Sequence, residues 1–348
     1  MGYFRKNIEQ AEGYTPGLQP HRAEVTKLNT NENPYPPSPA VLEVLSQITS
    51  EQLRRYPDPN ADEFRQAAAR INGVEPGCIM CGNGGDELLK IALQAFCDNK
   101  RPVSFAVPTY TLYAVLAKLN NCKAIEVAFD KEFNLPAKLS ATPAALTIVC
   151  NPNAPTGSIV SREEMVCLAD EIKGVLLVDE AYVDFAQDNC TELIKDFKNV
   201  LIIRSMSKGY GLAGIRFGYA IAQPSLIAGL MKVKDSYNVN TVSIAAAAAA
   251  IKDQKYFRRN IEKTKKERER LTEQLRQLGF TVPKSHANFV LAENSGYKAA
   301  EIYDKLLQRD ILVRFFPVPG LENKLRITIG TSRQNDILLD NLKEILPH

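Results

Sequence analysis

VLLVDEAY, residues 175–182, places four apolar residues directly before Asp179. A short apolar run of this kind is typical of a strand that is buried on both faces of a sheet, so the carboxylate stands at the end of that strand. A buried carboxylate needs a cationic or hydrogen-bonding partner. Two interpretations of Asp179 follow from these residues: it caps the start of a helix, or it pairs with a protonated ring nitrogen of a bound group.

Similar apolar runs alternate with helical periods on both sides of this strand. The expected strands are residues 78–81, 103–107, 146–150, 175–178, 200–203 and 217–221, and the expected helices are residues 61–70, 86–96, 111–119 and 163–172. This alternation predicts βαβ units and a mainly parallel sheet with helices on both faces. Functional residues are then expected at the carboxyl ends of the strands.

The rest of the chain is organised around this α/β core. Residues 1–40 are rich in Pro, Asn and Gly, which predicts an extended arm that packs on the active site and on a smaller domain. Residues 41–255 are expected to form the large domain. Residues 256–348 are expected to form a charged connector helix over residues 256–278 and then a small α+β domain.

Composition excludes several classes of protein. The 43 Lys and Arg residues nearly balance the 40 Asp and Glu residues, which argues against a nucleic-acid partner. No apolar run approaches the ~20 residues of a membrane span, and no signal peptide is recognised. The seven cysteines are scattered, and the single C-x-x-C at Cys78 and Cys81 has no second pair. We therefore expect a cytoplasmic protein without a metal site.

Residues 205–219 read SMSKGYGLAGIRFGY and directly follow an expected strand. A lone lysine is usually a surface charge, but the glycines at 209, 211, 214 and 218 remove side-chain bulk around Lys208. An ε-amine in such a setting can form a Schiff base with an aldehyde. Upstream, GNGGDELL at residues 82–89 is either an ordinary turn or a helix start whose backbone amides at Gly84, Gly85 and Asp86 bind an anion.

A collinear set of motifs accompanies this lysine: LNTNENPYPPSP at 28–39, RYPDPNADEF at 55–64, GNGGDELL at 82–89, PTY at 108–110, NPNAPTG at 151–157, DEAY at 179–182 and LRITIGT at 325–331. The set resembles the pyridoxal-phosphate-dependent aminotransferases of fold type I. The NENPY, RYPDP and LRITIGT segments are similar to the histidinol-phosphate aminotransferases in particular. The resemblance implies amino transfer between histidinol phosphate and 2-oxoglutarate, yielding imidazole-acetol phosphate and glutamate, in histidine biosynthesis.

The resemblance also implies a role for each cofactor residue. Lys208 would carry the cofactor and later act as the base that moves a proton, Asp179 would pair with the ring nitrogen, and Tyr182 would hydrogen-bond the ring 3'-oxygen. Tyr110 would stack on the ring, although an aromatic residue there could equally fill the core. The cofactor phosphate would be bound by Gly84, Gly85, Asp86, Ser205, Ser207 and Arg216. Tyr56 would reach that phosphate from the partner in a homodimer with a shared active site.

For the substrates, the resemblance assigns Arg326 as the clamp for the α-carboxylate of glutamate, because a guanidinium donates two parallel hydrogen bonds. Tyr14 and Arg314 would hold the substrate phosphate, and Asn31 would also bind substrate. One position departs from the family: many relatives have a second Asn where this chain has Ala154. Either Asn153 contacts the 3'-oxygen in its place, or Tyr182 holds that oxygen alone.

Other functions share this pattern. An aminotransferase for aromatic or many amino acids and a threonine-phosphate decarboxylase have the same fold and most of the same cofactor residues. A non-catalytic pyridoxal-phosphate sensor belongs to a different class, and regulators of that kind usually carry a DNA-binding segment. The sequence shows no basic recognition helix, so an enzyme is expected.

Overall fold

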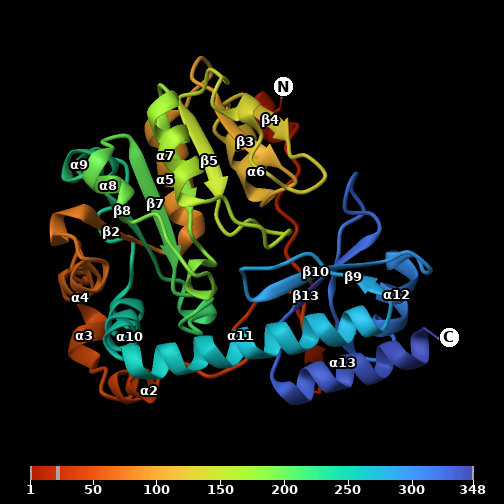
Figure 1. The fold of residues 1–348 in the computed structure, drawn as a ribbon. Helices are drawn as coiled ribbons and strands as arrows, with labels where there is room; N and C mark the ends of the chain where they lie inside the picture. The colour runs from red at the N-terminus through yellow and green to blue at the C-terminus, as the bar shows by residue number, and fades with distance from the viewer. Residues whose placement is uncertain (1, 21–23, 347–348) are drawn as a thin grey trace.

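The structure, a computed structural model, describes residues 2–20 and 24–346, and within them a seven-stranded sheet forms the larger unit (Figure 1). Its strand order is β2-β8-β7-β6-β5-β3-β4. The strands are β2 (Ile79–Gly82), β3 (Val103–Val107), β4 (Ala124–Ala128), β5 (Leu146–Cys150), β6 (Val175–Asp179), β7 (Val200–Ser205) and β8 (Gly218–Ala222). Only β8 runs against its neighbours among these strands, so the prediction of a mainly parallel sheet is confirmed.

Both faces of this sheet are covered, as the uninterrupted apolar strands require. In β6, Leu176 and Val178 belong to one hydrophobic cluster and Leu177 to the other, because successive side chains of a strand point to opposite faces. One cluster includes α4 (Asp62–Asn72), α7 (Arg162–Glu171), α8 (Leu193–Asp196) and α10 (Thr241–Lys252). The other includes α5 (Gly85–Phe96), α6 (Leu112–Leu119) and α9 (Pro224–Leu230).

A smaller unit is built on an antiparallel sheet of order β12-β13-β10-β9. Its strands are β9 (Phe280–Thr281), β10 (Phe289–Asn294), β12 (Arg314–Phe315) and β13 (Lys324–Thr328), and its helices are α12 (Ala299–Leu307) and α13 (Ser332–Ile345). The long helix α11 (Gln254–Gln277) runs beneath both units (Figure 1). Connected this way, the two units lie beside each other (Figure 1).

The N-terminal segment contacts both units. Near its start, α1 (Lys6–Glu9) lies on α6, where the Asn7 side chain donates to the Lys118 carbonyl at 2.9 Å. Further on, β1 (Thr26–Lys27) pairs in parallel with β11 (Ile311–Leu312) of the smaller unit. After this, α2 (Pro39–Ser46) and α3 (Ser50–Arg54) begin the larger unit. Residues 1 and 21–23 of the predicted arm lie outside the described residues.

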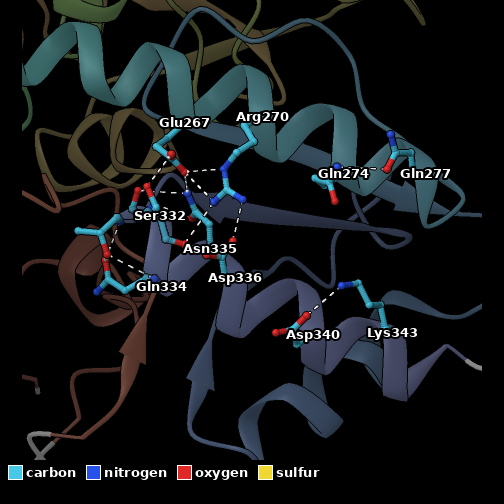
Figure 2. Close-up of polar contacts among 12 residues, drawn as sticks. Glu267, Arg270, Gln274, Gln277, Ser332, Gln334, Asn335, Asp336, Asp340 and Lys343 are labelled. Atoms are coloured by element: carbon cyan, nitrogen blue, oxygen red, sulfur yellow. Dashed lines mark hydrogen bonds and ion pairs between the residues drawn. The ribbon is translucent and has the colours of Figure 1, made fainter.

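A polar cluster ties α13 to α11 beside the strand β13 (Figure 2). Glu267 on α11 accepts hydrogen bonds from Ser332 Oγ at 2.7 Å and from Asn335 Nδ2 at 2.9 Å, and it also pairs with Arg270. The buried Asn335 also accepts a hydrogen bond from the Gly330 backbone N–H at 2.9 Å. These contacts fix the turn that follows β13, the strand whose side chains include Arg326 and Thr328.

Candidate active site

A cavity of about 230 Å³ lies where β6 and β7 end, against the N-terminal segment and the smaller unit. Most residues predicted for the site line it: Tyr14, Asn31, Gly85, Asp86, Tyr110, Asp179, Tyr182, Ser205, Ser207, Lys208, Arg216, Arg314 and Arg326. Gly84, Asn153 and Tyr56 do not. The position agrees with the rule that ligands of open α/β sheets bind beyond the carboxyl ends of the strands.

Asp179 ends β6 with its carboxylate buried. The Tyr113 hydroxyl donates to Asp179 Oδ2 at 2.6 Å, and the Ala181 backbone N–H donates to Oδ1 at 3.1 Å. Burial raises the pKa of Asp179 to about 6, and these two hydrogen bonds oppose that shift. Among the described residues the carboxylate has no ion-pair partner, so a buried anion here faces a cavity that can receive a cation. Asp179 is therefore not a simple helix cap.

Lys208 follows β7 and extends its amine to the N-terminal segment, where it donates to the Thr30 carbonyl at 3.1 Å. Asn33 of the same segment donates to the Lys208 carbonyl at 2.9 Å and so holds the backbone of the lysine loop. Burial, and next to it the charge of Arg326, lowers the pKa of Lys208 to about 8. The amine can thus lose its proton near neutral pH, as a nucleophile or base requires.

The start of α5 forms a cup suited to an anion. Gly84 has a φ of +87°, which L side chains rarely adopt, and a Cβ there would come within 2.8 Å of Arg216 Nη2, so a larger residue would be strained and would displace the guanidinium. Arg216 pairs with Asp86 at 3.2 Å and donates to Ser207 Oγ at 3.4 Å. Backbone amides at a helix start, a guanidinium and a hydroxyl together favour a phosphate.

Two arginines enter the cavity from the smaller unit. Arg314 and Arg326 are register partners on β12 and β13, and each guanidinium lies 5.4 Å from the Phe316 ring centre. Burial lowers the pKa of Arg326, whose Nε is buried without a hydrogen-bond partner among the described residues, while its Nη2 donates to the Asn29 carbonyl at 2.9 Å. Unsatisfied guanidinium groups of this kind are ready to bind anionic groups of a ligand.

Aromatic side chains form another part of the cavity wall. Tyr110 lines the cavity, donates to Asp86 Oδ1 at 3.2 Å, and packs edge-on against Tyr14 at 5.7 Å and Tyr113 at 5.6 Å between ring centres. Burial raises the pKa of Tyr110 well above its ordinary value. Its position at the cavity, rather than in the core, favours the interpretation that it contacts a ligand.

Asn153 is directed away from the cavity. Its side chain donates to the Pro108 carbonyl at 3.1 Å and to Thr156 Oγ1 at 2.9 Å, and it accepts a hydrogen bond from Thr109 at 2.7 Å. Ala154 lines the cavity in its place. Of the two alternatives for the 3'-oxygen, this arrangement favours Tyr182.

Tyr56 lies on the surface, outside the cavity. Its side chain is 81% exposed and stacks on Tyr237, with ring centres 4.5 Å apart. Among the described residues, no hydrogen bond or ring contact joins Tyr56 to a predicted site residue.

A model of the family described as aminotransferase class I and II matches residues 23–342. The chain belongs to this family. Membership confirms the predicted fold class and chemistry: the chain is a transaminase that uses pyridoxal phosphate.

Individual relatives make the similarity more specific. The histidinol-phosphate aminotransferase 1 of Trichormus variabilis is 46% identical over 346 residues, 99% of this chain and 99% of that protein. The histidinol-phosphate aminotransferase of Rhodopirellula baltica is 41% identical over 336 residues, 96% and 93% of the two chains. Among solved structures, the chain is similar to a histidinol-phosphate aminotransferase from Sinorhizobium meliloti, crystallised in complex with pyridoxal-5'-phosphate. The two are 27% identical with a TM-score of 0.90, and the match covers 99% of this chain and 98% of the other. The resemblance drawn from the motifs is confirmed.

Some residues that support the aminotransferase site were not predicted from the sequence. Tyr113, which donates to Asp179, lies in a helix with no motif of its own. Thr328 and Asn288 hydrogen-bond Asn31, although Thr328 stands inside the LRITIGT segment and so carried a signal. Their roles follow from contacts between distant segments, which spacing along the chain does not reveal.

Within residues 2–20 and 24–346, no group of His, Cys, Asp and Glu side chains could hold a metal ion. No helix there has the length and apolar character needed to cross a membrane.

Proposed function

We propose that this aminotransferase exchanges an amino group between histidinol phosphate and 2-oxoglutarate, as a cytoplasmic homodimer. The observation that carries the substrate proposal is the pair Arg314 and Arg326, two cations side by side at the cavity without a carboxylate partner among the described residues. Arg326 can bind the carboxylate of one substrate, glutamate, and Arg314 can bind the phosphate of the other, histidinol phosphate. Full-length similarity to histidinol-phosphate aminotransferases supports the same substrate.

The described residues fit pyridoxal phosphate. The phosphate would be held by the amides of Gly85 and Asp86 with Ser207 and Arg216, at the cup that a Cβ at Gly84 would close. When bound, this cofactor supplies an aldehyde that condenses with amines and a ring that accepts electrons from the substrate carbon. Asp179, a buried carboxylate without a cationic partner, would keep the ring nitrogen protonated.

The chain's own groups account for the remaining steps. Lys208, with its pKa lowered to about 8, can give up its proton and act as a free amine, and as a base it would move a proton between the substrate Cα and the cofactor C4'. Tyr182 would donate to the 3'-oxygen. Arg326 would clamp the carboxylate of glutamate, and Arg314 with Tyr14 would bind the phosphate of histidinol phosphate.

Two of the proposed properties concern the whole protein. Exposed Tyr56, outside its own cavity, supports a dimer in which it reaches the partner's site. The seven cysteines, all in the described part of the chain, are free thiols, which supports a reducing cytoplasm.

The substrate proposal is tested by visible absorbance. Protein loaded with pyridoxal phosphate is titrated with histidinol phosphate, phosphothreonine and phenylalanine, and the loss of the lysine-bound cofactor colour is followed, with Lys208→Ala as a blank. We expect histidinol phosphate to act at concentrations about 100-fold below phenylalanine, because charged hydrogen bonds to its phosphate are worth a few kcal/mol.

Arg314→Ala is expected to remove most of this preference. Arg309→Ala is the matched control, since Arg309 lies on the surface and pairs with Glu344. Equal response to phenylalanine would refute the substrate proposal, and preferential response to phosphothreonine would replace it, while the family assignment stands in both cases.

A further inference from the structure

A directed chain of hydrogen bonds leads to the hydroxyl of Tyr182. It begins at the backbone N–H of Asn31, which donates to Thr328 Oγ1 at 3.0 Å. Because a backbone N–H can only donate, the threonine oxygen accepts there, and its own proton is left for Asn31 Oδ1 at 3.0 Å. The side-chain oxygen Oδ1 of Asn31 therefore lies toward Thr328. The side-chain nitrogen Nδ2 of Asn31 then donates to the Tyr182 hydroxyl oxygen at 3.0 Å.

The direction of these hydrogen bonds determines where the hydroxyl proton of Tyr182 points. Its oxygen accepts from Asn31, so its O–H must point elsewhere. Among the described residues no acceptor receives that proton, and Tyr182 lines the cavity. Lys208 Nζ, 5.7 Å from the Tyr182 ring centre, is itself a donor. The hydroxyl proton is thereby presented to the cavity.

The residues of this hydrogen-bond network are held rigidly. Asn31, Thr328 and Asn288 are buried, and Asn288 Nδ2 donates to the Asn31 carbonyl at 3.0 Å. Asn31 has a φ of +55°, in the left-handed region that asparagine tolerates better than most residues. A satisfied buried network of this kind fixes the orientation of its members.

Apart from Tyr182, little at the cavity wall can donate a hydrogen bond to the 3'-oxygen of a bound cofactor. Ala154 contributes a methyl group, and the Asn153 amide is committed to Pro108 and Thr156. If Tyr182 alone donates to this 3'-oxygen, then a rotation of the Tyr182 hydroxyl would remove that hydrogen bond. The group that prevents the rotation is the amide of Asn31.

We propose that Asn31 is a positioning residue: through Thr328 it holds the Tyr182 proton on the 3'-oxygen of the cofactor. This inference rests on the proposed function for the cofactor site alone, and the substrate does not enter it. The role differs from the direct substrate contact that the sequence implied for Asn31. It also means that the N-terminal segment and β13 of the smaller unit act on the cofactor through one hydroxyl.

The experiment measures the pH midpoint of the colour change in protein loaded with pyridoxal phosphate and no substrate. A hydrogen bond donated to an oxygen favours its more negative form, so losing the bond moves the midpoint to higher pH. In Asn31→Asp the carboxylate has no N–H and accepts from Tyr182, which turns the proton away from the cavity. We expect the midpoint to rise by about one pH unit or more.

A new charge at position 31 would itself raise the midpoint, and Tyr182→Phe separates the two effects. Because Asn31 acts through the hydroxyl, Asn31→Asp is expected to shift the midpoint much less in the Tyr182→Phe background than in the parent. Equal shifts in the two backgrounds, or no shift in either, would overturn the proposal. A wrong substrate assignment would leave this measurement unaffected.

Thr328 provides an uncharged test of the same chain. Thr328→Val removes the hydroxyl that orients Asn31 and keeps the shape of the side chain, whereas Thr328→Ser keeps the hydroxyl. We expect a higher midpoint for the valine variant and a midpoint close to that of the parent for the serine variant. Identical midpoints for valine and serine would contradict the proposal.

Discussion

Asp179 carries a carboxyl group whose buried position favours the protonated form. Its pKa is raised from 3.8 to about 6, mainly by burial. The folded chain without cofactor therefore binds this proton more tightly than the unfolded chain does. The resulting contribution to stability is complete below pH ~4 and is lost as the pH rises to about 6, with at most ~3 kcal/mol involved.

Asp179→Asn should accordingly stabilise the cofactor-free protein. At about pH 7 we expect its free energy of unfolding to exceed that of the parent by about 1–2 kcal/mol, since the amide carries no charge but satisfies its two donors less well. Urea unfolding near pH 7 and near pH 4 measures this difference, which should fall by about 2 kcal/mol toward the lower pH and reach zero or reverse there. Asp188→Asn, at an exposed carboxylate, is the control. A less stable Asp179→Asn protein at pH 7 would disprove the argument.

The sequence was most informative where a residue stands at the end of an apolar strand. Asp179 ends β6 and Lys208 follows β7, and both line the cavity as expected. Tyr113 could not be found in this way, because its contact with Asp179 joins positions 66 residues apart and depends on how α6 packs on the sheet. The contact of Asn31 with Thr328, 297 residues apart, has the same origin.

Among the elements, the ends of the buried strands were predicted to within one or two residues, whereas an exposed strand was not predicted. Strand β4 (Ala124–Ala128) was missed because it is an edge strand and most of its side chains are partly or fully exposed, which breaks the apolar pattern. Helix α3 (Ser50–Arg54) was also missed, although Thr49 and Gln52 form a capping box that the sequence displays. The same signal at Thr331 and Gln334 marks the start of α13.

The junction of α11 with α13 yields a prediction at this scale. Asn335 is fully buried and bonds both Glu267 and the Gly330 N–H, so Asn335→Ala leaves a buried donor unsatisfied and a small cavity (Figure 2). We expect the free energy of the first unfolding transition in urea to decrease by about 2–3 kcal/mol. Asp336→Ala, which removes only the exposed ion pair with Arg270, should cost under ~1 kcal/mol. Equal losses would mean that the buried asparagine does not hold the junction.

At the scale of the whole molecule, the folded chain leaves several apolar side chains on its surface. Leu42 on α2 is 63% exposed, Leu53 on α3 is 62% exposed, and Tyr56 lies just beyond α3. Exposed apolar side chains grouped along one segment favour an interface with another protein surface. A symmetric dimer through this segment would carry Tyr56 toward the partner's cavity, where the family resemblance assigns it to the cofactor phosphate.

Mixing two inactive variants tests whether the active site is shared. In a mixed dimer of Lys208→Ala and Tyr56→Ala subunits, a shared site gives one cavity with both native residues and one with neither. Free exchange makes half of the dimers mixed, so we expect transaminase activity to recover to roughly a quarter of the parent's, above the sum of the separate variants. Arg309→Ala mixed with Lys208→Ala is the control for recovery that does not depend on a shared site: Arg309 pairs with Glu344 of its own chain, so the activity should equal the sum of the two separate variants. If Tyr56 served its own subunit, the mixture would show no recovery, since each cavity would still lack one of the two side chains.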